Sequence, residues 1–243
     1  MLITGAAGGI GLATARRVLD EGGRVALVDV DEQALAVAAA DLGAEAVALV
    51  ADVADESAIS AATDAAVRAF GGLDAVGATA AVPFSGDDDR ADRLDAAVWR
   101  ATLEANLTGA FLTAKHGLRA LAATGGGAVV CTGSVAGVHA VAPGLEAYSA
   151  SKAGLHGLVR VMAADYAALG IRVNAVLPGI TETPMNRGWL GDPEARAAMA
   201  ARVPLGRIGT AGEVASVIAF LLSDDAAYVT GALWAVDGGL TVP

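Results

Sequence analysis

The stretch that decides the fold is TGAAGGIG, residues 4–11. A short apolar run precedes it and a run with helical periodicity follows, so it should form the turn between a first strand and a first helix. Gly5, Gly9 and Gly11 would let the backbone turn tightly and approach a pyrophosphate on the free N–H groups that open the helix. A glycine-rich turn alone is weak evidence, but this one has the flanking strand and helix that the site needs. Together with Ile10, these glycines are the predicted dinucleotide contacts of the turn.

From this turn to the far end of the chain, short β-rich runs alternate with longer helical stretches, which is the pattern of a parallel α/β sheet. Several strands, such as VALVD at Val25–Asp29, are apolar on both faces, so helices should cover both sides of the sheet. We therefore predict one doubly wound α/β domain over residues 1–243. The expected strands are Leu2–Ile3, Val25–Asp29, Ala46–Val50, Ala75–Ala78, Ala128–Thr132, Arg172–Val176 and Leu233–Val236. The expected helices lie near Gly9–Glu21, Glu32–Leu42, Glu56–Phe70, Leu94–Ala123, Tyr148–Leu169 and Gly212–Leu222.

Composition narrows the classes of function and the compartment. The chain has 243 residues and one cysteine, Cys131, so it forms no internal disulfide, which favours a reducing cytoplasm. A net charge of −11 argues against nucleic acid as a partner, because phosphate contacts need a basic surface. The stretch Ala120–Leu145 lacks charged residues, but glycines and Pro143 interrupt it. A buried strand and loop are expected there, with no membrane span.

An acidic residue follows the second expected strand at the place where a coenzyme ribose would lie. Asp29 comes eighteen residues after Gly11. A carboxylate there can accept hydrogen bonds from the adenosine ribose and repels a 2′-phosphate. The next residue is Val30 rather than an arginine that could pair with that phosphate. The alternative is a solvated acid at a strand end. The pattern favours NAD over NADP, with Asp29 and Val30 beside the ribose.

The motif YSASK places Tyr148 and Lys152 four residues apart, on one face of a helix. Such a pair is common by chance, but Lys152 is one of two lysines, and Ser134 in TGSVAG follows a buried strand. Oxidation of a secondary alcohol needs a group that takes the hydroxyl proton as hydride leaves. A tyrosine does this if a nearby ammonium and a positive nicotinamide lower its pKa in a desolvated pocket. Ser134 would hold the substrate oxygen.

Taken together, the motifs resemble the short-chain dehydrogenase/reductase family in its ordinary form of roughly 250 residues. The resemblance covers essentially the whole chain. Its motifs are TGAAGGIG, DVAD at Asp52, NLTGAF at Asn106, GSVAG at Ser134, YSASK at Tyr148, IRVNAVLPGITETPM and YVTGALWAVDGG.

The resemblance implies a single Rossmann-like domain with a seven-stranded parallel sheet, NAD or NADP as the cofactor, and a homotetramer. It implies a catalytic tetrad that moves protons through a water chain, made of Asn106, Ser134, Tyr148 and Lys152. A lid over the substrate would lie near residues 183–205. The remaining implied cofactor contacts are Asp52 and Val53 at the adenine, Ala78 at the end of the fourth strand, Tyr148 and Lys152, and Pro178, Thr181 and Thr183 at the nicotinamide.

Two departures from the family pattern concern the site. The spacing from Ser134 to Tyr148 is fourteen, one more than the common value. The usual Asn-Asn-Ala-Gly after the fourth strand is here Ala-Thr-Ala-Ala, residues 78–81. The tie normally made by the first Asn should be absent or replaced by the Thr79 hydroxyl, and Ala81 should avoid positive φ.

The favoured function is hydride transfer between NAD(H) and a small secondary alcohol or ketone, with Tyr148 as the acid/base. The alternatives are an NADPH-dependent 3-oxoacyl-carrier-protein reductase and, in another class, a non-catalytic dinucleotide sensor. The acidic run Gly86–Asp95 is expected to be a solvated loop that caps the next helix. The histidines form no zinc pattern, and no metal is expected. His139 is a weaker candidate for substrate contact, and Met185 and Trp189 are candidate lid residues.

Overall fold

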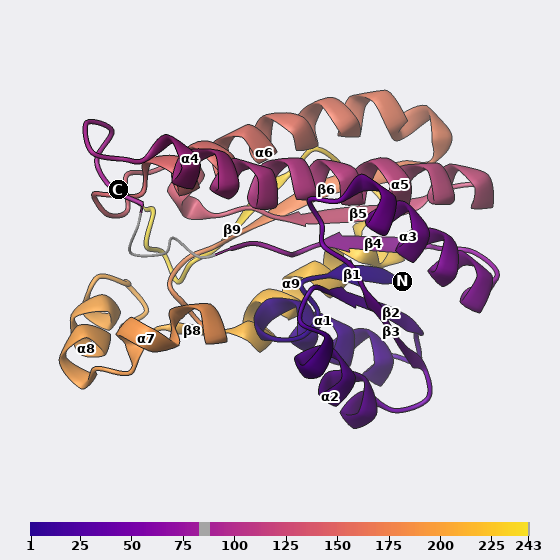
Figure 1. The fold of residues 1–243 in the computed structure, drawn as a ribbon, viewed down its shortest axis with the longest axis horizontal. Coiled ribbons are helices and arrows are strands. Elements are labelled where there is room, and N and C mark those ends of the chain that lie inside the picture. The colour runs from indigo at the N-terminus through magenta and orange to yellow at the C-terminus, as the bar shows by residue number, and fades with distance from the viewer. Residues whose placement is uncertain (83–87, 243) are drawn as a thin grey trace.

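The computed structural model describes residues 1–82 and 88–242. At its centre is a seven-stranded, entirely parallel sheet in the order β3-β2-β1-β4-β5-β6-β9 (Figure 1). This confirms the predicted fold class and all seven expected strands. The strands are β1 (Leu2–Thr4), β2 (Val25–Asp29), β3 (Ala46–Val50), β4 (Ala75–Ala78), β5 (Gly127–Thr132), β6 (Ile171–Pro178) and β9 (Leu233–Val236).

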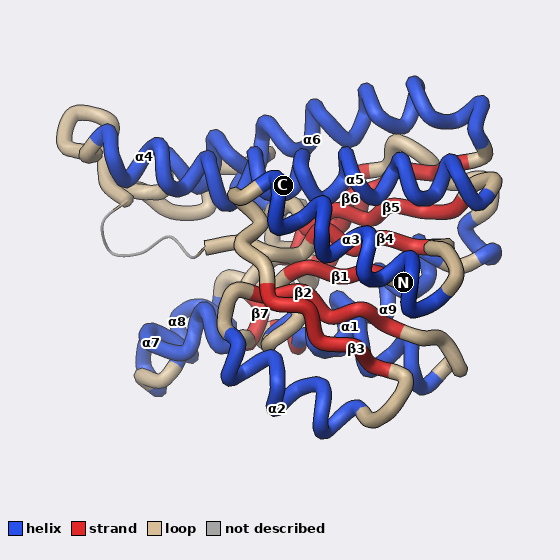
Figure 2. Tube along the Cα trace, turned by 45° about the vertical axis from the view of Figure 1, so that its right-hand side comes forward, coloured by secondary structure: helices blue, strands red, loops and turns tan. Residues whose placement is uncertain are grey.

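Helices cover both faces of the sheet, as its apolar strands require. One face carries the group α3, α4, α5 and α6, and the other carries α1, α2 and α9 (Figures 1 and 2). None of the helices in the described ranges is long and apolar enough to cross a membrane. The helices that cover the sheet are α1 (Gly9–Asp20), α2 (Glu32–Leu42), α3 (Glu56–Phe70), α4 (Ala96–Leu103), α5 (Gly109–Thr124), α6 (Glu146–Tyr166) and α9 (Ala211–Leu222).

The main core lies between the sheet and the helices α3, α5 and α6. Leu118 of α5 and Leu155 of α6 pack there against Val129 and Val173 of the central strands, and all four are essentially buried. Burial of apolar side chains contributes roughly 1.5–3 kcal/mol each. The two long helices are therefore anchored firmly, and α6 carries Tyr148 and Lys152 on this fixed support.

The strand order reverses between β1 and β4. From β1 the chain builds outward through β2 to β3, whereas β4 starts the other half of the sheet. Crevices for ligands in such sheets open at the carboxyl ends of the strands beside this switch point. The glycine turn after β1 and Thr79 after β4 meet there, and Ser134 follows β5 at the same edge.

Two local features differ from the sequence prediction. The expected helix Leu94–Ala123 is interrupted by a π-helical turn, Glu104–Thr108, which separates α4 from α5 and holds the fully buried Asn106. Such turns are frequent at functional sites. The segment after β6 also contains elements that were not predicted. They are β7 (Thr181–Glu182), α7 (Arg187–Leu190), α8 (Pro193–Ala201) and β8 (Gly209–Thr210), of which β7 and β8 form a separate parallel pair.

Candidate active site

The glycine turn has a shape that side chains would fill. Gly5 and Gly9 have φ values of 68° and 54°, and a Cβ on Gly5 would lie 2.7 Å from the Cα of Ala80. A Cβ on Gly11 would lie 2.1 Å from the carbonyl oxygen of Gly5. The N-terminus of α1 receives no side-chain cap, so its first N–H groups can bind an anion. This cradle fits the pyrophosphate of a dinucleotide.

Asp29, at the end of β2, is tied to the turn. Its Oδ2 accepts a hydrogen bond from the Ala7 N–H at 3.0 Å, and its Oδ1 accepts one from the Asp31 N–H at 3.1 Å. A carboxylate has further lone pairs for ribose hydroxyls. The Val30 side chain beside it is exposed and carries no charge that could receive a 2′-phosphate.

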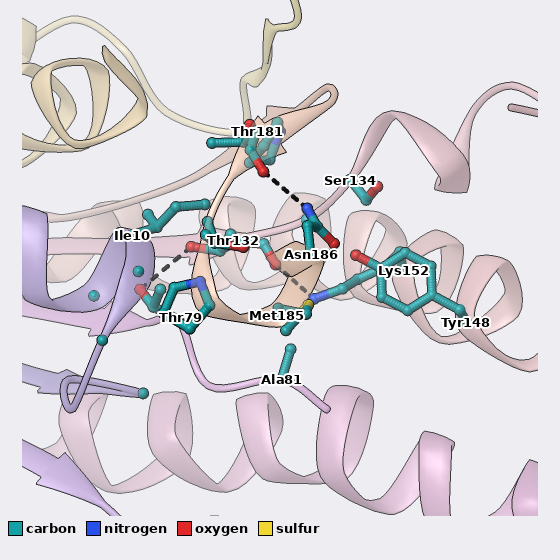
Figure 3. A pocket seen from close by; sticks show the side chains of 18 of the residues that line it. Ile10, Thr79, Ala81, Thr132, Ser134, Tyr148, Lys152, Thr181, Met185 and Asn186 are labelled. Carbon is teal, nitrogen blue, oxygen red and sulfur yellow. Dashed lines mark hydrogen bonds between the residues drawn. The ribbon is translucent and has the colours of Figure 1, made fainter. Parts of the chain in front are cut away.

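The end of β4 is held by threonines in place of the family's asparagine. The Thr4 hydroxyl accepts hydrogen bonds from the N–H groups of Thr79 and Ala80, at 3.2 and 3.4 Å. The hydroxyls of Thr132 and Thr79 lie 3.2 Å apart in a hydrogen bond (Figure 3). In the described ranges no residue except glycine has positive φ, so Ala81 avoids that region as expected. Hydrogen bonds with Thr4 and Thr132 therefore hold the Ala-Thr-Ala-Ala segment in place.

Ser134, Tyr148 and Lys152 come together beside this strand end (Figure 3). The Lys152 ammonium lies 5.7 Å from the centre of the Tyr148 ring and donates a hydrogen bond to the Thr132 carbonyl at 2.9 Å. Tyr148 and Ser134 share a side-chain hydrogen bond. The Ser134 Oγ also accepts from the Ala136 N–H at 3.1 Å, which fixes the turn after β5.

The protein groups alone do not lower the pKa of Tyr148. Burial around its hydroxyl raises that pKa, and the hydrogen bond with Ser134 opposes the shift. Burial also lowers the pKa of Lys152 to about 8, so the ammonium is still mostly protonated at neutral pH. The sequence predicted a lowered tyrosine pKa from Lys152 and the nicotinamide together. In the protein itself, desolvation raises the pKa of Tyr148, and the group that opposes it is Ser134.

The side chain of Asn106 bonds to Val82 after β4 and to Ser151 of α6. Its Oδ1 accepts from the Val82 N–H at 2.8 Å, and its Nδ2 lies 3.4 Å from the Ser151 hydroxyl. Asn106 therefore links the segment after β4 to α6. Its partner on α6, Ser151, directly precedes Lys152.

The loop that carries Ser134 contains two glycines that lie against the His156 ring. A Cβ on Gly133 or Gly137 would lie 2.5 or 2.6 Å from the imidazole ring of His156, which is 4% exposed. Burial, with the nearby charges of Lys152 and Arg160, lowers the pKa of His156 to about 4. The ring is neutral at pH 7, and its main effect is to set the distance between α6 and the loop that carries Ser134.

Two cavities meet at Tyr148. The first, of about 260 Å³, extends from the glycine turn and Asp29 to Lys152. The second, of about 420 Å³, is walled mostly by apolar side chains such as Val135, Leu145 and Ile180. Residues that line both are Ser134, Tyr148, Pro178, Gly179, Met185 and Asn186. Tyr148 and Ser134 therefore face the cavity lined by the glycine turn on one side and an apolar cavity on the other.

The comparisons with known proteins agree with this geometry. The family model described as enoyl-(acyl carrier protein) reductase matches residues 5–241. The chain is 46% identical to cis-4-hydroxycyclohexanecarboxylate dehydrogenase of Sinomonas cyclohexanicum, over 99% of this chain and 95% of that protein. It is 43% identical to 2-(S)-hydroxypropyl-CoM dehydrogenase 3 of Xanthobacter autotrophicus, over 98% and 95%. The crystal structure of gox2181 superposes with a TM-score of 0.94 at 35% identity, covering 100% of this chain and 95% of that one.

The chain belongs to the short-chain dehydrogenase/reductase family. It is an oxidoreductase of that family.

Most of the predicted cofactor residues of this dehydrogenase/reductase line the first cavity. Those residues are Gly5, Gly9, Ile10, Gly11, Asp29, Tyr148, Lys152, Pro178, Thr181 and Thr183. Four others do not line it. Val30 is exposed beside Asp29, Ala78 is buried in β4, Asp52 accepts a hydrogen bond from the Ala54 N–H, and Val53 packs against Gly109.

Several lining residues of this dehydrogenase/reductase were not predicted from its sequence. Thr79, Thr132 and Asn186 line the first cavity, and Arg202 lines the second. His139 is exposed and is not among the lining residues of either cavity. Met185 lines both, whereas the Trp189 side chain lies outside the described residues.

The expectation for the acidic run Gly86–Asp95 is partly wrong. Asp95 does cap α4, accepting from the Ala97 N–H. Asp88, however, is 9% exposed, and its two oxygens accept from the N–H groups of Ala147 and Tyr148, at 3.1 and 3.0 Å. Asp88 thus caps α6, the helix that carries Tyr148. The N-cap residue of α6, Leu145, provides no side-chain cap. Gly86 and Asp87 lie outside the described residues.

We expect Asp88→Ala to lower the stability of the dehydrogenase/reductase by about 1–2 kcal/mol, because it removes the acceptor of two N–H groups and a negative charge at a helix N-terminus. Thermal unfolding should show a melting temperature lower by a few degrees. Asp92→Ala is the matched control, since Asp92 pairs with Arg90 at the exposed surface. Equal melting temperatures for the two variants would contradict the capping role.

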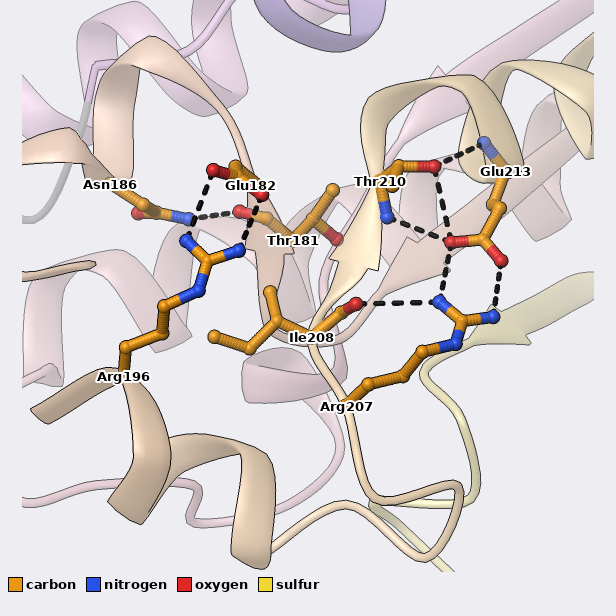
Figure 4. Close-up of polar contacts among 8 residues, drawn as sticks. All are labelled: Thr181, Glu182, Asn186, Arg196, Arg207, Ile208, Thr210 and Glu213. Atoms are coloured by element: carbon orange, nitrogen blue, oxygen red, sulfur yellow. Dashed lines mark hydrogen bonds and ion pairs between the residues drawn. The ribbon is translucent and has the colours of Figure 1, made fainter. Parts of the chain in front are cut away.

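The segment that follows Pro178 is anchored by a series of polar contacts (Figure 4). Asn186 Nδ2 donates to the Thr181 carbonyl at 2.8 Å, and Arg196 of α8 makes two hydrogen bonds to the Glu182 carboxylate, at 3.0 and 2.7 Å. Arg207 forms a similar pair with Glu213, which completes a capping box at the start of α9. These contacts place Met185 and Asn186 over both cavities.

Within the described ranges, no group of three or more His, Cys, Asp or Glu side chains could hold a metal ion.

Proposed function

We propose that the enzyme transfers a hydride between NAD(H) and a small secondary alcohol or ketone, with Tyr148 as the acid/base. The observation that carries this proposal is the position of Tyr148 and Ser134 at the junction of the two cavities. A dinucleotide in the first would reach its far end beside Lys152, and a substrate in the second would place its oxygen against the two hydroxyls.

The nicotinamide, when bound, supplies the carbon that takes or gives the hydride. In oxidation, the Tyr148 phenolate takes the hydroxyl proton of the substrate as the carbinol carbon loses its hydride, and a ketone is left. Ser134 holds the substrate oxygen by hydrogen bond. The Lys152 ammonium favours the phenolate by its charge. In reduction the same groups act in reverse, with Tyr148 as the acid.

The other predicted residues have supporting roles in this proposal. Pro178, Thr181 and Thr183 would orient the nicotinamide, and Asp52, Val53 and Ala78 would lie toward the adenine half. Asn106 would connect the tetrad to solvent by a water chain. Residues 183–205 would act as a lid on a single domain of residues 1–243.

NAD is the proposed coenzyme because a carboxylate, Asp29, lines the end of the first cavity where the ribose would lie. A 2′-phosphate there would be repelled, and Val30 offers it no cation. The same observation disfavours the NADPH-dependent 3-oxoacyl-carrier-protein reductase. A dinucleotide sensor without catalysis would have no need for the placement of Ser134, Tyr148 and Lys152 that the site has.

The proposed substrate is small, with a largely apolar or cyclic body, because apolar side chains form most of the second cavity. The relatives named above are dehydrogenases of cis-4-hydroxycyclohexanecarboxylate and of 2-(S)-hydroxypropyl-CoM, and the cyclic and short hydroxyl-bearing parts of these substrates support this class.

The test is a panel of secondary alcohols and ketones assayed with NAD(H) and NADP(H) by nicotinamide absorbance. We expect turnover of cyclic or short alcohols with a clear preference for NAD. Turnover confined to 3-oxoacyl thioesters with NADPH would support the rival reductase, and no turnover with either coenzyme would overturn the proposal.

We further propose a cytoplasmic homotetramer. The single Cys131 is buried and unpaired, which suits a reducing compartment. Trp99 of α4, Phe111 of α5 and Val161 of α6 are exposed apolar side chains on the helices that cover one face of the sheet, where subunits would pair with two-fold symmetry. Light scattering at micromolar concentration should give the mass of four chains, and a monomer alone would contradict the assembly.

A further inference from the structure

We propose that the substrate of this enzyme carries an anionic group, such as a carboxylate, and that Arg202 binds it. The inference rests on the proposed function and narrows its substrate class. Arg202 ends α8 and lines the apolar cavity that Tyr148 and Ser134 face. Among the described residues that line this cavity, it is the only one with a positive charge.

The bonding of Arg202 differs from that of its neighbours in the same segment. Arg196 and Arg207 each hold a carboxylate with two N–H groups, in pairs with Glu182 and Glu213 (Figure 4). Within residues 1–82 and 88–242, no carboxylate lies within ion-pair distance of Arg202. Its guanidinium donates to the Val141 carbonyl and makes a long contact with the Met199 sulfur.

These contacts hold the exposed Arg202 guanidinium at the cavity wall, and they include no carboxylate. A guanidinium has five N–H donors in a planar fork that matches a carboxylate, and most of them stay available. Val141 belongs to the loop 138–145, and Val141, Ala142, Pro143, Gly144 and Leu145 all line the cavity. The hydrogen bond therefore fixes Arg202 against the loop that shapes the substrate site.

The carboxylate of Asp88 lines the same cavity, yet it does not neutralise Arg202. Both Asp88 oxygens accept N–H groups from the start of α6. The positive end of the helix dipole and these hydrogen bonds compensate its charge. The cavity thus has an acid/base at Tyr148, apolar walls, and one exposed cation that no carboxylate pairs with among the described residues. A secondary alcohol with a carboxylate beyond an apolar spacer matches those three features.

The experiment compares hydroxy acids with their methyl esters: 4-hydroxycyclohexanecarboxylate and 3-hydroxybutyrate, each assayed with NAD as acid and ester. Wild type should prefer at least one acid to its ester by KM. Arg202→Gln should raise the KM for that acid about 10- to 100-fold, the usual effect of losing a charge-assisted hydrogen bond. It should change the KM for the ester less than about threefold and leave kcat for the acid nearly unchanged.

The KM of Arg202→Lys for the acid should lie between the values of wild type and Arg202→Gln, because lysine keeps the charge and loses the planar fork. The matched control is Arg119→Gln on the exposed side of α5, which removes the same net charge away from the cavities. The acid preference of the wild type should also weaken as salt is raised. A merely structural role, through Val141 and the loop, would raise the KM of acid and ester alike.

The inference fails if no acid is preferred to its ester, or if Arg202→Gln leaves the preference intact. A neutral alcohol that turns over with no acid preference would defeat this inference alone. If no alcohol turns over, the proposed function fails. The role of Arg202 is then tested separately, by measuring ligand binding. The NADH-bound enzyme should then still bind cyclohexanecarboxylate more tightly than cyclohexanecarboxamide in isothermal titration, in an Arg202-dependent way, and equal binding would refute the anion site.

Discussion

Tyr148→Phe should lower kcat for alcohol oxidation by about 10²–10⁴-fold, the usual contribution of a positioned acid/base. The substitution removes one hydroxyl from the junction of the two cavities and keeps the ring, so packing on α6 is preserved. Affinity for NADH, measured by titration calorimetry, should change little, because the phenyl ring still closes the end of the coenzyme cavity.

The matched control is Tyr228→Phe, which removes the same hydroxyl from a fully exposed side chain. It should keep wild-type activity and stability. If Tyr148→Phe retains more than about a tenth of wild-type kcat, Tyr148 is not the acid/base and the proton must pass through another group.

The pH profile gives a second readout of the same assignment. Burial raises the pKa of the Tyr148 hydroxyl, so the phenolate needed for oxidation becomes more abundant as pH rises above neutral. Oxidation by the wild type should therefore speed up from pH 7 toward alkaline pH, and reduction should slow down. The residual activity of Tyr148→Phe should lose this dependence. An unchanged pH profile in the variant would assign the titration to a different residue.

The sequence predicted the sheet well because its signals are local. Each strand is a short apolar run with turn residues at its ends, and each long helix has its periodicity within one segment. The spacing of the glycines in the turn also has a local structural cause. A Cβ at Gly11 would overlap the Gly5 carbonyl, so the spacing of these glycines reports a contact between residues six positions apart.

Asp88 shows where local signals end. In the sequence it belongs to a charged run that is typical of a solvated loop, and its partners Ala147 and Tyr148 are about sixty residues away. Nothing near Leu145 marks α6 as a helix whose cap comes from elsewhere. Arg202 is similar, because one arginine among several in a polar segment has no feature that places it on a cavity wall.

The pKa of Tyr148 could not be inferred from spacing either. YSASK correctly puts Lys152 on the same face of α6, and the ammonium lies 5.7 Å from the tyrosine ring. Yet the lysine points its Nζ at the Thr132 carbonyl, and both groups are desolvated where α6 packs against β6 and the turn after β5. How much burial opposes charge depends on that packing and not on the motif.

Exchanging the charges at the ribose end of the coenzyme cavity should reverse the coenzyme preference. The double variant Asp29→Asn with Val30→Arg should raise the ratio of kcat/KM for NADP to that for NAD by about 100-fold, since it removes a repulsion and adds a phosphate partner. Asparagine is the better choice at position 29, because its Oδ1 can still accept from the Ala7 N–H, which Asp29 holds at 3.0 Å. An alanine there would loosen the glycine turn and lower the affinity for both coenzymes.

The single variants separate the two contributions. Asp29→Asn alone should raise kcat/KM for NADP, because it removes the repulsion. Val30→Arg alone should raise it less, because the carboxylate remains. The gain with NADP should shrink as salt is raised, because Val30 is exposed and the new ion pair would be screened. If the wild type already uses NADP as well as NAD, or if the double variant leaves the ratio unchanged, Asp29 does not face the ribose. The first cavity would then hold its nucleotide in another register, with the adenosine away from the end of β2.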